Sequence, residues 1–172
     1  MSGRILVHHE RCLACKRCRI ACIVAHSASG TLLGAIEDRN PPPARISLAP
    51  RGRRVIPAAC RHCDAAACIL ACPTGAVSRA APGSPVVLRR EKCVGCRSCV
   101  LACPYGVPRL ASHGGEVAKC DLCIERLGRG GIPACVEACP TGTLEWRDDR
   151  ESDALFDRSP LWEAGVCDGS ES

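Results

Sequence analysis

Hydrophobic positions along this chain occur in short runs, none of which keeps a helical or a strand period for long. Three runs predict short β-strands, at 4–7, 44–48 and 86–89. Three other segments, each close to glycine or to polar breakers, predict short helices, at 21–26, 74–77 and 141–144. The pattern therefore indicates a fold built from small helices and small strands.

Two stretches interrupt this pattern. Residues 27–57 contain three consecutive prolines at 41–43 and a basic run at 51–54, so we expect a surface arm suited to docking. The second stretch, between Cys123 and Cys135, is rich in glycine and is predicted to be the other variable loop.

The composition leaves little apolar material for a conventional core. Of 172 residues, 17 are cysteine, whereas leucine, isoleucine, valine and phenylalanine together make up about 21%, close to the level below which chains stay disordered. Aromatic residues are scarce, with one Phe, one Tyr and two Trp. A large barrel or Rossmann core is therefore excluded, and something other than apolar side chains must organise the interior.

The chain shows no targeting or membrane signal. Its first twelve residues hold only three consecutive apolar side chains, no run approaches the roughly 18 that span a bilayer, and no twin-arginine pair precedes a hydrophobic segment. We therefore expect a cytoplasmic protein, although a partner with an export signal could carry it across a membrane. In a reducing compartment, cysteines at this density are expected to bind metal rather than to form disulfides.

Sixteen of the 17 cysteines form four groups of four, an internal repeat along the chain. Groups one and three have the spacing C-x2-C-x2-C-x3-C, group two has C-x2-C-x4-C-x3-C, and group four has C-x2-C-x11-C-x3-C. In order, the groups are Cys12, Cys15, Cys18 and Cys22; Cys60, Cys63, Cys68 and Cys72; Cys93, Cys96, Cys99 and Cys103; and Cys120, Cys123, Cys135 and Cys139. Proline follows the last cysteine of groups two, three and four, at Pro73, Pro104 and Pro140.

The spacing of groups one and three is the ligation pattern of bacterial ferredoxins for a [4Fe-4S] cluster. A cysteine at every third residue lets three thiolates of one tight loop converge on a cluster face, while backbone N–H groups point at the sulfurs. The fourth cysteine is expected to ligate the neighbouring cluster. Proline after it would suit the first turn of a helix. The sixteen cysteines therefore predict four [4Fe-4S] clusters.

Zinc and disulfides are the alternatives to iron. Group four alone resembles a zinc module, but groups one and three place a third cysteine where zinc needs none. Disulfides are disfavoured because closely spaced cysteines make poor bridging partners. Cys167 lies outside every group and is expected to be a free surface thiol, and none of the five histidines is needed as a ligand. We find no nucleotide-binding loop, catalytic base or nucleophile.

Charge divides the chain into a basic body and an acidic end. Residues 1–144 carry 20 basic and 9 acidic side chains, whereas residues 145–172 carry 3 basic and 9 acidic. A basic body can indicate nucleic-acid binding, but four clusters with their thiolates would add about −8, and aromatic stacking platforms are absent. We therefore interpret the basic residues beside the cysteines as counter-charges. They include Lys16, Arg17, Arg61, Lys92, Arg97 and Lys119. The acidic end, with Trp146, Phe156 and Trp162, is either solvated or a strap that orders against a partner.

Four segments carry a family resemblance: RCLACKRCRIACIVAHS at 11–27, CRHCDAAACILACPTGAV at 60–77, EKCVGCRSCVLACPYGVPR at 91–109 and KCDLCIERLGRGGIPACVEACPTGTL at 119–144. With these motifs in order, the chain resembles the four-cluster [4Fe-4S] ferredoxin-like electron-transfer subunits of the dimethyl sulfoxide reductase iron-sulfur type. It is most similar to the soluble subunits of carbon monoxide dehydrogenase, aldehyde oxidoreductase and hydrogenase complexes. Ala67, where the family often has proline, and Ile23, where the other groups have proline, are departures that remove no ligand.

The resemblance implies an α+β fold of two ferredoxin-like halves with pseudo-twofold symmetry around four clusters. Residues 1–54 and 113–147 would form a discontinuous half with groups one and four, residues 55–112 a continuous half with groups two and three, and residues 148–172 an acidic tail. The implied ligation crosses between groups, and we name each ligand set by its first member. The Cys12 set is Cys12, Cys15, Cys18 and Cys139; the Cys120 set is Cys120, Cys123, Cys135 and Cys22; the Cys60 set is Cys60, Cys63, Cys68 and Cys103; and the Cys93 set is Cys93, Cys96, Cys99 and Cys72.

By the same resemblance, the protein would be an electron-transfer subunit without an active site of its own. It would relay electrons one at a time between a catalytic redox subunit, which would meet the half with groups one and four, and an acceptor. The implied catalytic partner is a tungsten or molybdenum aldehyde or formate oxidoreductase, a carbon monoxide dehydrogenase or a hydrogenase, and the acceptor is a flavin, a quinone or a ferredoxin. Two alternatives stay open, a free-standing polyferredoxin carrier and a redox sensor or structural metal protein. We expect neither a nucleic-acid partner nor a membrane span.

Overall fold

The elements of this fold are short, as the hydrophobic pattern predicted. A computed structural model of the chain describes residues 3–52, 54–111 and 117–148. The longest helix in these ranges has ten residues, and none of their helices has the length and apolar character needed to cross a membrane. In chain order the elements are β1 (Gly3–Val7), η1 (His9–Arg11), α1 (Arg17–His26), α2 (Leu32–Glu37), β2 (Ser47–Arg51), β3 (Arg54–Ala58), α3 (Ala67–Leu70), β4 (Val77–Ser78), β5 (Val87–Leu88), η2 (Arg90–Lys92), α4 (Ser98–Ala102), β6 (Arg109–Leu110), β7 (Val117–Ala118), α5 (Ile124–Gly128), α6 (Ala134–Glu137) and β8 (Leu144–Asp148).

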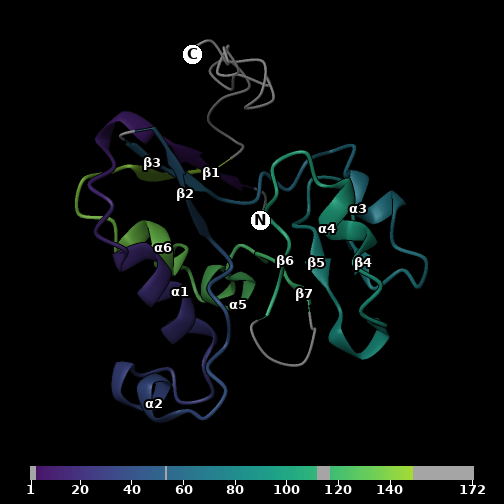
Figure 1. Ribbon diagram of the computed structural model, residues 1–172. Helices are drawn as coiled ribbons and strands as arrows, with labels where there is room; N and C mark the ends of the chain where they lie inside the picture. Colours follow the sequence, from purple (N-terminus) through teal and green to yellow (C-terminus); the bar gives the residue numbers. More distant parts are fainter. Residues whose placement is uncertain (1–2, 53, 112–116, 149–172) are drawn as a thin grey trace, which may run out of the picture.

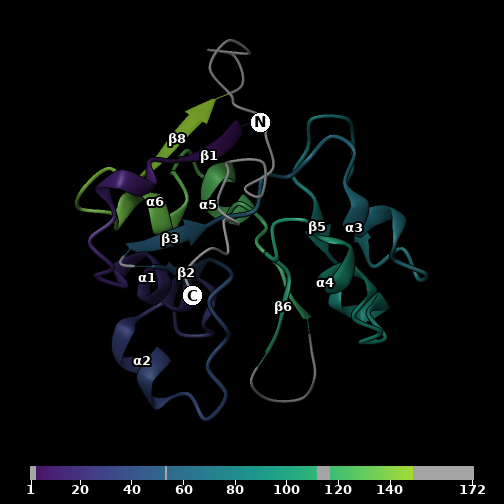
Figure 2. The ribbon, with the colours of Figure 1, turned by 45° about the horizontal axis from the view of Figure 1, so that its top comes forward.

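The described strands form four antiparallel two-stranded sheets: β1 with β8, β2 with β3, β4 with β5, and β6 with β7. Three of these sheets pair strands that follow one another along the chain. The fourth pairs the first strand with the last, from Gly3 opposite Asp148 to Val7 opposite Leu144 (Figure 2). In Figure 1, β1, β2 and β3 lie with α1, α5 and α6 on one side, whereas β4 and β5 lie with α3 and α4 on the other.

Trp146 lies in β8, so its assignment to an acidic end that is either solvated or a strap is wrong. It pairs with Ile5 of β1 and packs against a buried hydrophobic cluster. A Cβ added at Gly3 would lie 2.4 Å from the indole ring, so a side chain at that position would displace the ring. Trp146 therefore stabilises the pairing of the two chain-distant strands. Phe156, Trp162 and Cys167 lie outside the described residues.

Within the part of the chain that the structure describes, buried apolar side chains form two small clusters, and both include cysteines. The first cluster is Ile5, Cys22, Ile46, Leu122, Leu127, Cys135 and Leu144. The second is Ala66, Val77, Val86, Cys99 and Val117. Because each cluster is so small, apolar burial alone supplies little of the stability that a domain of this length needs.

Residues 27–57 do not form a simple surface arm, contrary to the prediction. They contain α2, whose start is capped by the hydroxyl of Thr31 accepting from Gly34 N–H at 3.2 Å, and the hairpin of β2 and β3. Ala44 and Ile46 are buried, at 4% and 3% exposure. The segment therefore contributes to the core, and its first strand begins at Ser47 rather than at 44.

The helices predicted at 74–77 and 141–144 are wrong, because both segments are turns that lead into β4 and β8. The helices α3, α4 and α6 lie before the last cysteine of their groups and end there. Proline disfavours the helical conformation in the residue before it, and Gly75 and Gly142 take the left-handed φ values of 65° and 63°. Only the predicted helix at 21–26, in the group without this proline, lies inside an observed helix, α1.

Candidate metal centres

None of the sixteen grouped cysteines forms a disulfide, and they differ widely in exposure. Cys15 and Cys96 are exposed. The buried ones are Cys22, Cys99, Cys123 and Cys135, and the other ten are half-buried.

The first two cysteines of each group enclose a tight turn with a residue in the left-handed conformation. These residues are Ala14, His62, Gly95 and Leu122, with φ of 54°, 49°, 70° and 61°. In two groups this turn directs an amide at the preceding sulfur, since His62 N–H donates to Cys60 Sγ and Leu122 N–H donates to Cys120 Sγ, both at 3.5 Å. Left-handed backbone is costly for residues with a Cβ, so its recurrence at the same place marks a constraint on the site. Turns of this kind present amides to an anion, as thiolate ligation requires.

The turn after the last cysteine holds that cysteine's sulfur in groups two and four. Val77 N–H donates to Cys72 Sγ at 3.4 Å, and Leu144 N–H makes the corresponding bond to Cys139. A threonine hydroxyl lies beside each sulfur, Thr74 Oγ1 at 3.8 Å from Cys72 Sγ and Thr141 Oγ1 at 3.7 Å from Cys139 Sγ. Burial opposes ionisation of both thiols, but these hydrogen bonds outweigh it and lower their pKa.

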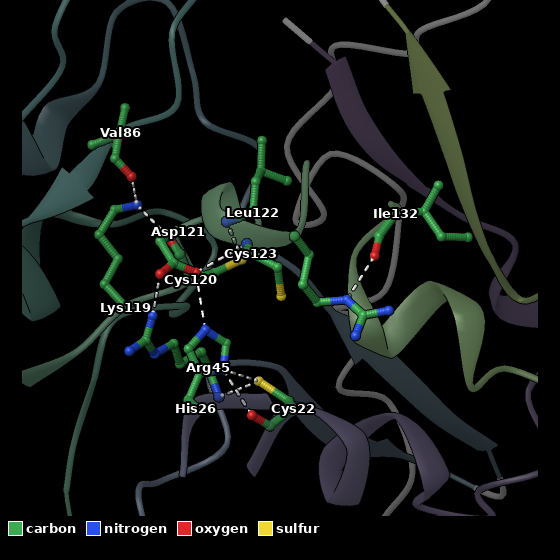
Figure 3. Close-up of polar contacts among 11 residues, drawn as sticks. Cys22, His26, Arg45, Val86, Lys119, Cys120, Asp121, Leu122, Cys123 and Ile132 are labelled. Atoms are coloured by element: carbon green, nitrogen blue, oxygen red, sulfur yellow. Dashed lines mark hydrogen bonds and ion pairs between the residues drawn. The ribbon is translucent and has the colours of Figure 1, made fainter. Parts of the chain in front are cut away.

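Cys22, the last cysteine of group one, is held differently because α1 continues past it to His26. Its sulfur accepts a hydrogen bond from the backbone N–H of Arg45, at 3.2 Å. The Arg45 side chain reaches Asp121 Oδ2 at 2.5 Å, and Asp121 Oδ1 lies 3.1 Å from His26 Nε2 (Figure 3). His26 Nδ1 lies 2.7 Å from the Cys22 carbonyl oxygen. The network thus joins three distant segments of the chain around one sulfur.

In this network, hydrogen bonds and opposite charges outweigh burial in setting the pKa of His26 and of Asp121. Burial disfavours the imidazolium, but hydrogen bonds to Asp121, Cys123 and Cys22 raise the pKa of His26 to about 12. Burial also disfavours the carboxylate, yet His26 and Arg45 hold the pKa of Asp121 well below its usual range. The ligand atoms of His26, Asp121 and Cys123 lie within 4.8 Å of one another, which is metal-binding distance. Because Arg45 and a charged His26 neutralise Asp121, we interpret the trio as an ion-pair network that the sequence analysis missed.

Helices α1 and α6, which carry cysteines of groups one and four, pack against each other. One cavity is lined by Cys12, Cys15, Cys18 and Cys139. Burial raises the pKa of Cys18 to about 11, and the thiolates of Cys139, Cys15 and Cys12 add to the rise. The last cysteine of group four therefore lies beside the first three of group one.

The converse contact brings Cys22 of group one to group four. Burial raises the pKa of Cys135 strongly, and its neighbours Cys22, Cys123 and Cys18 raise it further. Burial likewise raises the pKa of Cys120, with smaller contributions from the cysteines Cys60 and Cys135. Cys120 therefore faces both its own group and group two.

The last cysteines of groups two and three likewise lie near earlier cysteines of the other group. Burial raises the pKa of Cys63, Cys68 and Cys99, and neighbouring cysteines of both groups add to each rise. These neighbours are Cys60 and Cys103 for both Cys63 and Cys68, and Cys72, Cys93 and Cys96 for Cys99. The structure thus gathers the predicted site residues into clusters of thiols that mix two groups.

The donor chemistry of these thiol clusters fits [4Fe-4S] ligation. Thiolates select zinc or iron–sulfur clusters, and N–H donors to the sulfurs tune iron–sulfur centres. Cys12, Cys15, Cys18 and Cys139 line one cavity, together with apolar residues such as Leu48 and Leu144.

Comparison with known proteins agrees with this chemistry. The family model described as "4Fe-4S dicluster domain" matches residues 53–149. The "Iron-sulfur protein" of Rhodospirillum rubrum is 37% identical over 156 residues, which cover 84% of this chain and 81% of that protein. The thiosulfate reductase electron transfer subunit PhsB of Salmonella typhi is 36% identical over 145 residues, covering 83% and 74%. The formate dehydrogenase-O iron-sulfur subunit of Escherichia coli is 32% identical over 155 residues, covering 82% of this chain but 51% of that subunit.

The predicted cofactor is confirmed by the matching family together with the spacing of the cysteines: the protein holds four [4Fe-4S] clusters. The predicted family relationship is confirmed as well, because the matched residues make up more than half of the chain. The chain belongs to the 4Fe-4S dicluster domain family.

Proposed function

We propose that this protein is an electron-transfer subunit of an oxidoreductase complex, with its four clusters held by the Cys12, Cys120, Cys60 and Cys93 sets. A bound [4Fe-4S] cluster accepts and returns one electron at a time. The chain supplies ligands, hydrogen-bond donors and charges that position and tune these centres, and it has no active site of its own. The names of two relatives, an electron transfer subunit of thiosulfate reductase and an iron-sulfur subunit of formate dehydrogenase, support this assignment.

The neighbours of the buried thiols support a linear order of the sets. Cys135 lies near Cys18, which links the Cys120 set to the Cys12 set. Cys120 lies near Cys60, which links the Cys120 set to the Cys60 set. Helices α3 and α4, which carry members of the Cys60 and Cys93 sets, contact each other. The proposed order of the relay is therefore Cys12, Cys120, Cys60 and Cys93.

The position of the exposed cysteines carries the proposal. Cys15 and Cys96 are exposed and belong to the two terminal sets, whereas all eight cysteines of the two middle sets are buried or half-buried. An exposed apolar residue accompanies each, Leu13 at 72% and Val94 at 68% exposure. Electrons enter and leave a relay at its surface, so these two places are suited to two different partners.

We also propose the division into two ferredoxin-like halves, residues 1–54 with 113–147 and residues 55–112, followed by an acidic tail at 148–172. The pairing of β1 with β8 and the contact of α1 with α6 support the discontinuous half. The contact of α3 with α4 supports the continuous half.

For the partners, we propose a catalytic redox subunit that oxidises an aldehyde, formate, carbon monoxide or hydrogen, and an acceptor that carries a flavin, a quinone or a ferredoxin-type cluster. The half with groups one and four would face the catalytic subunit, in the cytoplasm. A free-standing polyferredoxin carrier is the second candidate, because four clusters would serve it equally.

Anaerobic purification of the tagged full-length protein tests these proposals. We expect ~16 iron and ~16 labile sulfide per chain, four clusters times four each, and copurification of a large redox subunit. Zinc in place of sulfide would refute the relay. Four reducible clusters without any partner would favour the free carrier.

Charged substitutions at the two exposed apolar residues test the two ends separately. Leu13→Asp is expected to release one partner and Val94→Asp the other, while iron content stays unchanged. Leu33→Asp on α2 is the matched control, because Leu33 is 74% exposed but belongs to none of the four cysteine groups in sequence. Loss of the same partner in both variants would contradict the assignment of two ends.

A further inference from the structure

Lys119 is a charged residue buried in the interior, with 4% of its surface exposed. Its Nζ lies 2.6 Å from the Val86 carbonyl oxygen and 2.8 Å from that of Cys120 (Figure 3), and 3.5 Å from Cys60 Sγ. An ammonium group has three N–H donors and no acceptor, so three acceptors saturate it. The three contacts thus fix the Lys119 Nζ at one place.

The negative charge that compensates Lys119 comes from the thiolates around it. Burying a full positive charge is costly, and two carbonyl oxygens supply only partial charges. Asp121, the nearby carboxylate, is engaged by Arg45 and His26. Burial raises the pKa of Cys68 and Cys120, and the Lys119 charge opposes that rise in both. Because its Nζ contacts both Cys60 Sγ and the Cys120 carbonyl oxygen, its field reaches both middle sets, the Cys60 set and the Cys120 set.

The Cys60 set also lacks a hydrogen-bond donor that two other sets have. In groups two and four, the residue five positions after the last cysteine, Val77 or Leu144, donates its N–H to that cysteine's sulfur. In group three this position is Pro108, which has no N–H to donate. Cys103, the fourth member of the Cys60 set, therefore cannot receive this bond. Lys119 donates to the first member of the same set.

Lys92 shows that this role does not follow from sequence position. It directly precedes the first cysteine of group three, as Lys119 precedes that of group four, but Lys92 is exposed. Water screens the charge of an exposed lysine, whereas the charge of a buried one acts at short range with little screening. The two lysines are therefore a matched pair that differ in burial.

We propose that Lys119 raises the reduction potentials of the two middle clusters together, and that it gives the Cys60 set the donor that Pro108 withholds. Reduction adds one negative charge to a cluster, and a fixed positive charge nearby favours that reduced form. Because both potentials rise together, the difference in potential between the Cys60 set cluster and the Cys120 set cluster stays small. Electrons can then pass readily between residues 55–112 and the rest of the relay. This inference rests on the proposed function, since it assigns clusters to these two sets.

The test is a redox titration of the anaerobically purified full-length protein, followed by electron paramagnetic resonance. In Lys119→Met, two of the four midpoint potentials should fall, each by about a tenfold change in the ratio of reduced to oxidised cluster, which is 59 mV for a one-electron couple. The other two should move by much less. The control Lys92→Met should leave those two potentials unchanged. Equal shifts in both variants would overturn the role of burial.

Iron and labile sulfide analysis separates the possible failures. A wild-type protein without four clusters refutes the proposed function itself. A Lys119→Met protein with four clusters and unchanged potentials refutes only the role of Lys119.

Pro108→Ala keeps the proposal testable where Lys119→Met fails to retain its clusters. This variant restores an N–H opposite Cys103 without removing any charge, so one midpoint potential should rise. Unchanged potentials in Pro108→Ala would show that the missing donor is irrelevant and would overturn that part of the proposal.

Discussion

Cys22 and Cys139 occupy the same place in the repeat, but different parts of the chain hold their sulfurs. Cys139 precedes a Pro-Thr-Gly turn, and the residues that bond to its sulfur lie within the next five positions. Cys22 lies inside α1, and its donor, Arg45, is 23 residues away in sequence. The first site is built by a local turn, and the second depends on the folding of a separate segment.

This contrast assigns a role to residues 27–57 that their composition does not suggest. The segment brings the Arg45 backbone to the Cys22 sulfur, and Asp121, which also contacts His26, holds the Arg45 side chain. An insertion that would otherwise be tolerated as a surface loop therefore donates a hydrogen bond to a cysteine sulfur of group one. Changes at a distance should affect the Cys22 site much more than the Cys139 site.

Removal of iron should have the largest effect, because it removes what organises both sites. The two hydrophobic clusters are small and include cysteines, so the apo protein should lose cooperative unfolding, as small metal domains do without their metal. Circular dichroism and thermal denaturation before and after anaerobic chelation measure this. An apo protein that still unfolds in one cooperative transition would show that the clusters do not organise the two sites.

Cys139→Ala and Cys22→Ala should each remove one cluster, but not the same one. By crossed ligation, Cys139→Ala should lose the cluster of the Cys12 set and Cys22→Ala that of the Cys120 set, leaving ~12 iron per chain in each case. Paramagnetic resonance identifies the missing signal. Cys167→Ala, outside all four groups, is the control with ~16 iron. Loss of the same signal in both variants would rule out crossing.

Asp121→Asn should damage the Cys22 site selectively. Asparagine keeps the shape but leaves Arg45 and a charged His26 without their carboxylate. We expect a loss of about 1–3 kcal/mol in unfolding free energy, below the 3–5 kcal/mol of fully buried pairs because the Asp121 side chain is 24% exposed. Denaturant unfolding of the cluster-loaded protein measures it.

The control for Asp121→Asn is Glu137→Gln, which breaks the exposed pair with Arg126 at 2.6 Å. Surface pairs contribute about 0–1 kcal/mol, so this control should be nearly neutral. Equal losses in the two variants would mean that the Cys22 network has no special role.

Thr141→Val should have the smallest effect and should change only the Cys139 site. It removes a hydroxyl 3.7 Å from Cys139 Sγ and 2.8 Å from Thr143 Oγ1, at a cost of about 1 kcal/mol or less. The midpoint potential of the Cys12 set cluster should fall slightly. Thr74→Val makes the same change beside Cys72, so it should instead move the potential of the Cys93 set cluster. If both variants changed the potential of the same cluster, each turn would not act only on its own cysteine.

The repeat, the cofactor and the first strand could be predicted from the sequence because they depend on short-range geometry. Cys12, Cys15 and Cys18 lie so close along the chain that their convergence in one loop follows from connectivity. The same local rules failed after the last cysteine, where we interpreted Pro73 and Pro140 as helix starts. Proline fits the first turn of a helix and equally ends the helix before it, and the following glycine decides in favour of a turn.

Tertiary structure decided which distant groups meet and which charges are buried. Spacing alone left open which group would provide the fourth thiol beside Cys18, and the packing of α1 on α6 brings Cys139 there. Lys92 and Lys119 stand at the same point of the repeat, yet only Lys119 becomes enclosed by Val86 and Cys60 from another part of the chain. Burial and charge compensation depend on which segments pack together across long sequence separations. A local motif does not determine that packing.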